Sequence, residues 1–321
     1  MNNQSKALYI VVPCYKEQEV LPETSRRLRE KVLSLRKQGK ISDASRVMFV
    51  NDGSTDDTWK IISRLHAEDP DVFSGVNLTR NRGHQNALLA GLATAVNYAD
   101  MIVSMDADLQ DDIDAVDEMV DRYHEGFDVV YGVRSKRDTD TFFKRFTAEG
   151  FYKVMKALGV DIVFNHADYR LMSRRAVEGL MQFEEVNLFL RGIVPQIGYK
   201  WTTVTYERAE RFAGESKYPL KKMLAFAADG ITSFSVKPIR LVLLVGVIVF
   251  LVSIAMLAYA LVSKLMGHTS AGWTSLMGSI WLIGGIQLLS LGVVGEYIGK
   301  IYNETKRRPR FIIESVINKA D

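Results

Sequence analysis

Two long uncharged stretches near the C-terminus restrict the fold of this chain most strongly. Residues 241–263 carry no charged side chain, and between residues 265 and 295 only His268 can carry a charge. At about 1.5 Å per residue, a helix over the first stretch would be about 35 Å long, which exceeds the roughly 30 Å hydrocarbon core of a bilayer. The stretches predict a membrane hairpin over residues 236–298, with helices at about 239–264 and 273–295.

Basic residues flank this hairpin on its outer sides. Lys237 and Arg240 precede it, and residues 300–310 contain five Lys or Arg residues, whereas the connection offers only Lys264 as a permanent cation. Cationic flanks remain on the cytoplasmic side of a membrane. This distribution predicts a multi-pass protein with both termini in the cytoplasm and a basic cytoplasmic tail over residues 299–321.

Residues 1–235 alternate short apolar runs with helical patterns. The apolar runs are residues 8–12, 47–50, 76–78, 101–105 and 129–133, and the helical patterns are residues 21–38, a helix from 54 or 55, 85–97 and 114–125. Buried strands that alternate with helices indicate an α/β domain with a mostly parallel sheet covered on both faces. Ligands of such sheets bind beyond the carboxyl ends of the strands, so the residues that follow these runs are expected to converge.

An acidic motif follows the fourth apolar run. Asp106 and Asp108 stand there with one small residue between them. Two carboxylates so placed can share one hard divalent cation, Mg²⁺ or Mn²⁺, which often keeps phosphates as its remaining ligands. The alternative interpretation is a solvated acidic turn.

The basic residues of the chain gather near the hairpin. With 41 basic and 38 acidic residues the net charge is only +3, which predicts no nucleic-acid partner. Residues 134–160 intersperse cations with aromatic side chains, and a second basic group lies at 208–222. Residues 134–160 would ordinarily be a surface helix with a buried aromatic face. Beside a membrane they fit an interfacial helix whose cations meet phosphate head groups.

Several motifs carry a resemblance to a known family. Val11–Glu17, Asn51–Asp56 and Asp106–Asp111 occur in order and closely resemble the motifs of family 2 glycosyltransferases of the GT-A fold, which is Rossmann-like. With Asp168–Leu171, Gly214–Tyr218 and the hairpin added, the chain resembles polyprenyl-phosphate glycosyltransferases, which include bactoprenol glucosyltransferases and dolichyl-phosphate mannose synthases.

The resemblance implies a function. It implies inverting, metal-dependent transfer of one hexose, with glucose as the favoured sugar, from a UDP-sugar to undecaprenyl phosphate. The product would serve the modification of a surface polymer. The expected location is the cytoplasmic face of a bacterial inner membrane, with the lipid bilayer as a further partner.

The resemblance also assigns the donor site. The implied nucleotide-binding residues are Pro13, Tyr15, Glu17, Asp52 and Asp106. Asp52 would accept a hydrogen bond from the uracil imide N–H, and its alternative role is an ordinary helix cap. Asp106 and Asp108 would hold the cation that neutralises the departing UDP. Residues 80–84 follow the third strand, where family members contact the nucleotide, and the alternative is that Arg80 and Arg82 are solvated.

Asp168 stands where the family places its catalytic carboxylate. A polyprenyl phosphate is already anionic near neutral pH and hardly requires a general base. Asp168 is therefore expected to orient the acceptor or to stabilise positive charge at the anomeric carbon, and the alternative is a structural salt bridge with Arg170. Cations must hold the lipid phosphate beside the diphosphate. The candidates are Arg134, Arg137, Arg170, Arg211 and Lys217, of which the last two are favoured because Gly214 and Ser216 suit a mobile lid.

Other functions remain open from the sequence. The donor could be UDP-N-acetylglucosamine or another UDP-sugar, or the reaction could join GDP-mannose to dolichyl phosphate. Processive polysaccharide synthases carry a Gln-x-x-Arg-Trp signature, which Asn187–Gly192 lacks. A non-catalytic nucleotide-sugar sensor and a metal-dependent hydrolase are the rival classes. Hairpin glycines and the tail at Arg307–Ile317 could support a homo-oligomer.

Overall fold

The structure is a computed structural model that describes residues 5–134, 166–186, 190–207, 237–266 and 272–319. The chain divides into two compact units. One consists of Met1–Lys153, Asp161–Pro219 and Pro309–Asp321, and the other of Val154–Val160 and Leu220–Arg308. Of the basic and aromatic segment predicted at residues 134–160, only Arg134 is among the described residues.

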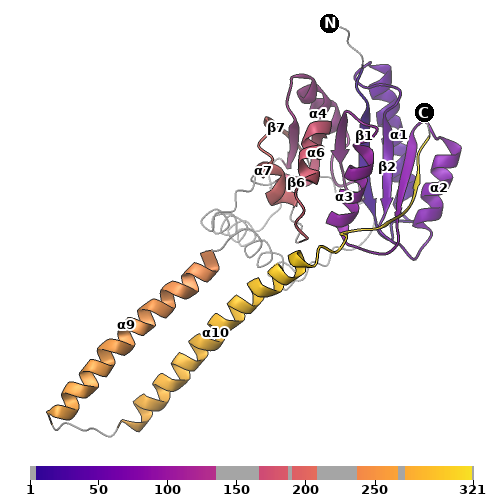
Figure 1. The fold of residues 1–321 in the computed structure, drawn as a ribbon. Coiled ribbons are helices and arrows are strands. Elements are labelled where there is room, and N and C mark those ends of the chain that lie inside the picture. The colour runs from indigo at the N-terminus through magenta and orange to yellow at the C-terminus, as the bar shows by residue number, and fades with distance from the viewer. Residues whose placement is uncertain (1–4, 135–165, 187–189, 208–236, 267–271, 320–321) are drawn as a thin grey trace. The chain divides into compact units, whose positions relative to one another are not determined.

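An eight-stranded sheet forms the centre of the first unit (Figure 1). Its strand order is β7-β5-β6-β4-β1-β2-β3-β8. The strands are β1 Leu8–Cys14, β2 Arg46–Asn51, β3 Phe73–Leu78, β4 Met101–Ser104, β5 Val129–Arg134, β6 His166–Ser173, β7 Trp201–Tyr206 and β8 Ile313–Ile317. Strands β4, β1, β2 and β3 are parallel neighbours, and so are β5 and β7. Strands β6 and β8 run antiparallel to their neighbours. The predicted α/β fold with a mostly parallel sheet is confirmed.

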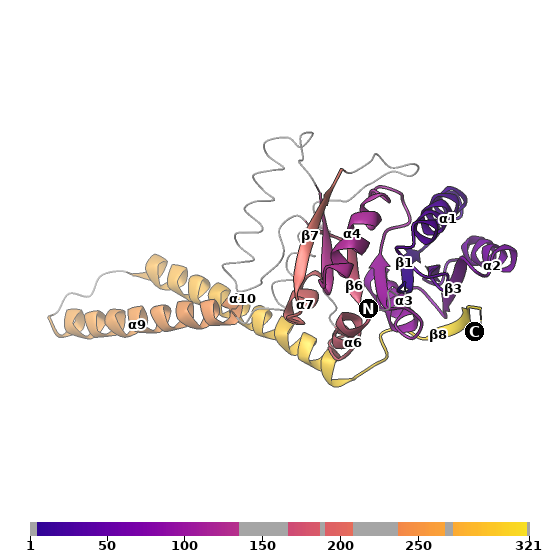
Figure 2. The same cartoon turned by 90° about the horizontal axis from the view of Figure 1, so that it is seen from above.

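Helices cover both faces of this sheet. In the first unit they are α1 Leu21–Lys37, α2 Thr58–Glu68, α3 His84–Ala95, α4 Ala115–His124, α6 Arg174–Met181 and α7 Leu190–Gln196. Ile10 and Val12 of β1 belong to the core cluster that contains Leu28 of α1. The intervening Val11 faces Gly91 of α3. Because successive strand residues point to opposite faces, α1 and α3 lie on opposite sides of β1 (Figure 2).

Helix α2 begins later than the sequence predicted. Its first residue is Thr58, with Asp57 at the N-cap. Polar side chains hold the preceding residues as a loop: Asn51 Oδ1 accepts from the Ser54 amide, and Asp56 Oδ1 accepts from the Thr58 amide. Short polar side chains that bond to the nearby backbone compete with helix formation, which explains why these residues do not form the first turn of α2.

The C-terminal segment contributes a strand that the sequence did not indicate. Residues 313–317, which the sequence placed in a basic tail, form β8 along the outer edge of β3. Ile317 packs against the core cluster of the sheet. The apolar side chain of Ile317 therefore has a burial site, which a basic tail in solution would not require.

The second unit contains two long helices. They are α9, Lys237–Leu265, and α10, Trp273–Thr305, and they contact each other. Among the described residues, Leu282–Thr305 is the segment long and apolar enough to cross a membrane by length and composition. Many of its large apolar side chains are exposed, Leu288 at 72% and Leu289 at 69%. Apolar surface of this extent requires a partner or a lipid environment.

Candidate active site

The sequence motifs that follow β1, β2 and β4 lie together at the edge of the sheet where these parallel strands end. The register aligns Cys14 of β1 with Asn51 of β2, and Val11 of β1 with Ser104 of β4. The segments that follow β1, β2 and β4 therefore start at one edge. Pro13 is buried within β1, and Tyr15 is 44% exposed just beyond it. The Glu17 amide donates to Thr58 Oγ1 at 3.0 Å, so the β1–α1 loop is fixed to the start of α2.

Asp52 binds backbone instead of capping α2. Its side chain is 2% exposed, and its two oxygens accept hydrogen bonds from the amides of Arg82 and Gly83, at 2.7 and 2.9 Å. Burial raises the pKa of Asp52. Each carboxylate oxygen has a second lone pair, so these bonds leave acceptor capacity. Gly53, at φ +60°, lies so close to the β3–α3 loop that a Cβ there would be 2.5 Å from the Asn81 nitrogen.

The acidic pair lies at the same edge. Asp106 Oδ1 is 2.8 Å from Nε2 of His84, the first residue of α3. A carboxylate only accepts hydrogen bonds, so this nitrogen carries the proton. Burial would lower the pKa of His84, but its hydrogen bond with Asp106 prevails and raises it. Asp108 Oδ1 accepts from the Gln110 amide at 3.2 Å, in a turn where Leu109 has φ +57°.

The donor set fits a hard divalent cation that also binds substrate. Asp106 and Asp108 offer carboxylate oxygens, the ligands that Mg²⁺ and Mn²⁺ prefer. Within the described parts of the chain, no group of three or more His, Cys, Asp or Glu side chains could hold a metal. Such a cation often keeps phosphates among its remaining ligands.

Asp111 is a functional candidate that the sequence analysis missed. It is 3% exposed, and the hydroxyl of Tyr206 donates to its Oδ1 at 2.5 Å. Burial, followed by the nearby charge of Asp106, raises the pKa of Asp111 to about 6. Arg134, expected from the sequence to bind lipid phosphate, has Nη2 3.7 Å from Asp111 Oδ1. The signal was available, since Asp111 belongs to the acidic motif.

Asp168 of β6 is held by two arginines. Arg191 Nη2 lies 3.1 Å from its Oδ2, and Arg170 Nη2 lies 3.1 Å from its Oδ1. Burial opposes ionisation, but the charges of Arg191 and Arg170 prevail and hold the pKa of Asp168 well below its usual range. Asp168 is therefore an anion throughout the neutral range. Arg191, from the start of α7, is the second residue that sequence reasoning missed, because its segment, Asn187–Gly192, was compared only with the signature of processive synthases.

The prediction for Arg170 requires a correction. Its side chain is 1% exposed, so it is not accessible to a lipid head group, and it forms the salt bridge with Asp168 that was the alternative interpretation. Its Nε and Nη1 have no hydrogen-bond partner among the described residues. The other expected lipid-phosphate ligands Arg137, Arg211 and Lys217 lie outside the described residues.

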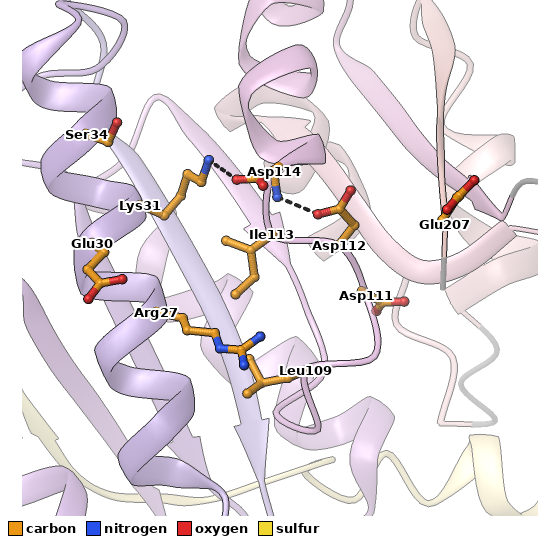
Figure 3. Close-up of a pocket in the computed structure, with 10 residues that line it drawn as sticks. All are labelled: Arg27, Glu30, Lys31, Ser34, Leu109, Asp111, Asp112, Ile113, Asp114 and Glu207. Atoms are coloured by element: carbon orange, nitrogen blue, oxygen red, sulfur yellow. Dashed lines mark hydrogen bonds and ion pairs between the residues drawn. The ribbon is translucent and has the colours of Figure 1, made fainter. Parts of the chain in front are cut away.

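A pocket of about 620 Å³ lies behind the acidic motif, between α1 and residues 109–114 (Figure 3). Lys31 of α1 closes one side of it by binding Asp114 and Asp117 at 2.5 and 2.6 Å. The side chains that line it carry both signs of charge, Arg27 and Lys31 facing several carboxylates. The pocket therefore lies between α1 and residues 109–114, and the ion pair between Lys31 and Asp114 connects its two sides.

Family models match both parts of the chain. The model of glycosyl transferase family 2 matches residues 9–181, and the model of the GtrB C-terminal hairpin matches residues 237–301. The uncharacterized glycosyltransferase YkoT of Bacillus subtilis (strain 168) is 52% identical over 98% of this chain and 93% of its own length. A prophage bactoprenol glucosyl transferase homolog of Escherichia coli (strain K12) is 40% identical over 96% of this chain and 98% of its own length.

A further relative and a solved structure are similar to this chain. The bactoprenol glucosyl transferase of Shigella phage SfV is 40% identical over 95% of this chain and 97% of its own length. Glucosyl-3-phosphoglycerate synthase from Mycobacterium tuberculosis, solved with Mn²⁺, UDP-glucose and phosphoglyceric acid, is 18% identical with a TM-score of 0.47, over 72% of this chain and 79% of that one. From its family model and its relatives, this chain is a glycosyltransferase that belongs to glycosyl transferase family 2.

Proposed function

We propose that the enzyme transfers one hexose, glucose in the first place, from a UDP-sugar to a polyprenyl phosphate such as undecaprenyl phosphate. The observation that carries this proposal is the pair of arginines on Asp168. A carboxylate with so low a pKa is a poor general base. It suits an acceptor that arrives deprotonated, as a lipid phosphate does. The relatives named bactoprenol glucosyl transferase support the same acceptor class.

The proposed reaction is a single displacement. An oxygen of the lipid phosphate attacks the anomeric carbon, the bond from that carbon to the β-phosphate oxygen breaks, and UDP leaves with inverted configuration at the sugar. Asp168 would stabilise positive charge at the anomeric carbon or orient the acceptor. A divalent cation bound by Asp106 and Asp108 would neutralise charge on the departing UDP.

The other residues would bind the two substrates. Pro13, Tyr15 and Glu17 would line the base and ribose, and Asp52 would accept from the uracil imide N–H. Asp106 would also contact the ribose. Four cations, with Arg170 no longer among them, would hold the lipid phosphate: Arg134, Arg137, Arg211 and Lys217.

A lipid acceptor, which resides in the membrane, would explain why the chain has an apolar hairpin. We propose that α9 and α10 both cross a bacterial cytoplasmic membrane and that both ends of the chain face the cytoplasm. Support comes from the basic residues outside the hairpin and from the hairpin family model. Cys14 is buried and is the single cysteine, so introduced cysteines report cleanly. In intact cells, an impermeant maleimide should label Ser270→Cys but not Lys60→Cys. Labelling of Lys60→Cys alone would refute this topology.

A transfer assay tests the proposed reaction. Detergent-solubilised full-length protein is incubated with radiolabelled UDP-glucose, Mn²⁺ and undecaprenyl phosphate, and the products are extracted into chloroform. Radioactive lipid supports the proposal. Free glucose alone would indicate a hydrolase, and UDP-glucose binding without turnover would indicate a sensor. Parallel reactions with UDP-N-acetylglucosamine, and with GDP-mannose and dolichyl phosphate, identify the donor.

A further inference from the structure

A chain of side-chain hydrogen bonds connects the C-terminal strand β8 with the turn that follows β2. Asn77 Nδ2 donates to Glu314 Oε2 at 2.7 Å, and Asn51 Nδ2 donates to Asn77 Oδ1 at 2.7 Å. Asn51 Oδ1 accepts from the Ser54 amide at 3.2 Å. We infer that Glu314 is a positioning residue of the nucleotide-sugar site and acts through these two asparagines.

The carboxylate of Glu314 fixes the orientation of both amides. Because a carboxylate only accepts, Asn77 must turn its NH₂ group toward Glu314 and its oxygen toward Asn51. Asn51 must then donate to Asn77, which leaves its own oxygen to accept from Ser54. Asn51 is 2% exposed and Asn77 is 9% exposed. A buried amide that loses its partner leaves a polar group unsatisfied, which is costly. The loss of Glu314 should therefore be felt along the whole chain of bonds.

An irregularity in the sheet brings Glu314 into place. Ser315 pairs with Asn77 and Ile313 pairs with Leu78, so Glu314 is the extra residue at a bulge between β3 and β8. A bulge redirects the side chain of its strand. In a regular antiparallel pair, Glu314 would point to the face opposite to that of Ser315 and Asn77. The bulge lets its carboxylate reach the Asn77 amide.

The turn at the far end of these bonds joins the parts of the proposed donor site. The Lys16 amide donates to Ser54 Oγ at 3.0 Å, which ties the first-strand motif to the turn. Asp52, two residues before Ser54, holds the loop at Arg82 and Gly83. Residues 306–312 connect α10 to β8 along the chain. A segment that follows the membrane hairpin in sequence therefore supports the nucleotide end of the site.

Paired variants test this inference, which rests on the proposed donor. The dissociation constant of UDP with Mn²⁺ and the KM values for UDP-glucose and undecaprenyl phosphate are measured. Glu314→Ala and Asn77→Asp should each weaken UDP binding and raise KM for UDP-glucose about five- to tenfold, the effect of one lost hydrogen bond. KM for undecaprenyl phosphate should not change. Glu314→Gln, which keeps an acceptor, should remain close to wild type.

The double variant Asn77→Asp with Glu314→Gln separates the hydrogen bonds from strand docking. It reverses the donor and the acceptor between positions 77 and 314 while the Asn51 bond is kept, so it should recover UDP binding. Lys319→Ala is the matched control, because Lys319 anchors the same segment to Asp71 at 2.7 Å without contacting these amides. It should bind UDP as the wild type does. Equal loss in Glu314→Ala and Lys319→Ala, or no recovery in the double variant, would overturn the inference.

Hydrogen exchange gives a readout that needs neither ligand nor turnover. Glu314→Ala should accelerate exchange of the amides of residues 51–58, and Lys319→Ala should not. Unchanged exchange in Glu314→Ala would also overturn the inference. If the wild type bound UDP but transferred no sugar, the proposed acceptor reaction would fail while the effect of Glu314 on UDP binding could still be measured.

Discussion

Arg191 of α7 places its Nη2 3.1 Å from Oδ2 of Asp168 on β6, opposite the buried Arg170. The two positive charges outweigh the burial of the carboxylate and keep it ionised. A group held as an anion stabilises developing positive charge well and accepts a proton poorly. This geometry suits the proposed acceptor, a lipid phosphate that is already anionic.

Replacement of Arg191 should show that turnover depends on an ionised Asp168. In wild type the pKa of Asp168 is depressed, so Asp168 contributes no loss of kcat as the pH falls from 8 to 5. In Arg191→Leu the pKa of Asp168 rises, and kcat should fall at least about tenfold with an acidic limb at higher pH. KM for UDP-glucose should change less. Arg122→Leu, which removes an arginine from exposed pairs on α4, is the control. A wild-type profile in Arg191→Leu would contradict this role.

Asp111 should make stability depend on pH in metal-free protein. Its pKa is raised to about 6 by burial and then by Asp106, against about 3.9 when unfolded. Because the folded protein holds the Asp111 proton more tightly than the unfolded chain does, this group contributes stability that is fully present below about pH 4. The contribution is lost as the pH rises through about 6. In EDTA, the free energy of unfolding of Asp111→Asn should therefore rise relative to that of wild type as the pH increases from about 4 to 7, by on the order of 2 kcal/mol. Thermal unfolding in detergent measures the difference. A pH-independent difference would refute this.

Added Mn²⁺ extends the same measurement. A cation held by Asp106 and Asp108 would offset their negative charge and lower the pKa of Asp111. The difference in the free energy of unfolding between wild type and Asp111→Asn at pH 8 should then become smaller. No response to Mn²⁺ would count against a cation at this pair, whatever the activity of the protein.

Gly53→Ala should disrupt the donor site. Gly53 has φ +60°, and an added Cβ would be 2.6 Å from Cα of Arg80, so the turn and the β3–α3 loop would have to separate. We expect at least tenfold weaker UDP binding and a lower Tm. Gly39→Ala is the matched control, since Gly39 has φ +69° with open space around its Cβ. It should cost only about 1 kcal/mol and leave UDP binding intact. Equal effects in both would show that the loop contact is unimportant.

Arg211 should affect the acceptor and not the donor. Replacement by Gln removes one cation from the proposed lipid-phosphate site, and KM for undecaprenyl phosphate should rise about tenfold. Arg64→Gln, an exposed arginine of α2, serves as the control. An increase confined to KM for UDP-glucose would move Arg211 to the donor site.

Local patterns in the sequence predicted the sheet and the positions of the acidic motifs. Apolar runs marked the strands, and the carboxyl-edge rule brought Asp52 and Asp106 to one place. The partners of these residues were not readable. Arg191 of α7 meets Asp168 of β6 across 23 positions of sequence, and Asn77 meets Glu314 across 237 positions. Such contacts arise from packing between distant segments and leave no periodic pattern.

Hydrogen bonds from side chains to nearby backbone amides also shifted the start of helix α2. The sequence favoured a helix from residue 54 or 55, but Asn51 and Asp56 bind nearby amides and delay α2 to Thr58. Strand β8 was missed because it depends on pairing with a strand that is distant in sequence. Its few apolar residues follow a basic segment, and only the exposed edge of β3 makes a strand favourable there.

The most direct test of the account compares wild type with Asp106→Ala/Asp108→Ala in the transfer of radiolabelled glucose to undecaprenyl phosphate. With Mn²⁺ we predict chloroform-extractable product from wild type, abolished by EDTA, and a rate at least about a hundredfold lower in the double variant, because charge on the departing UDP is no longer neutralised. Transfer by the double variant at the wild-type rate would contradict the account.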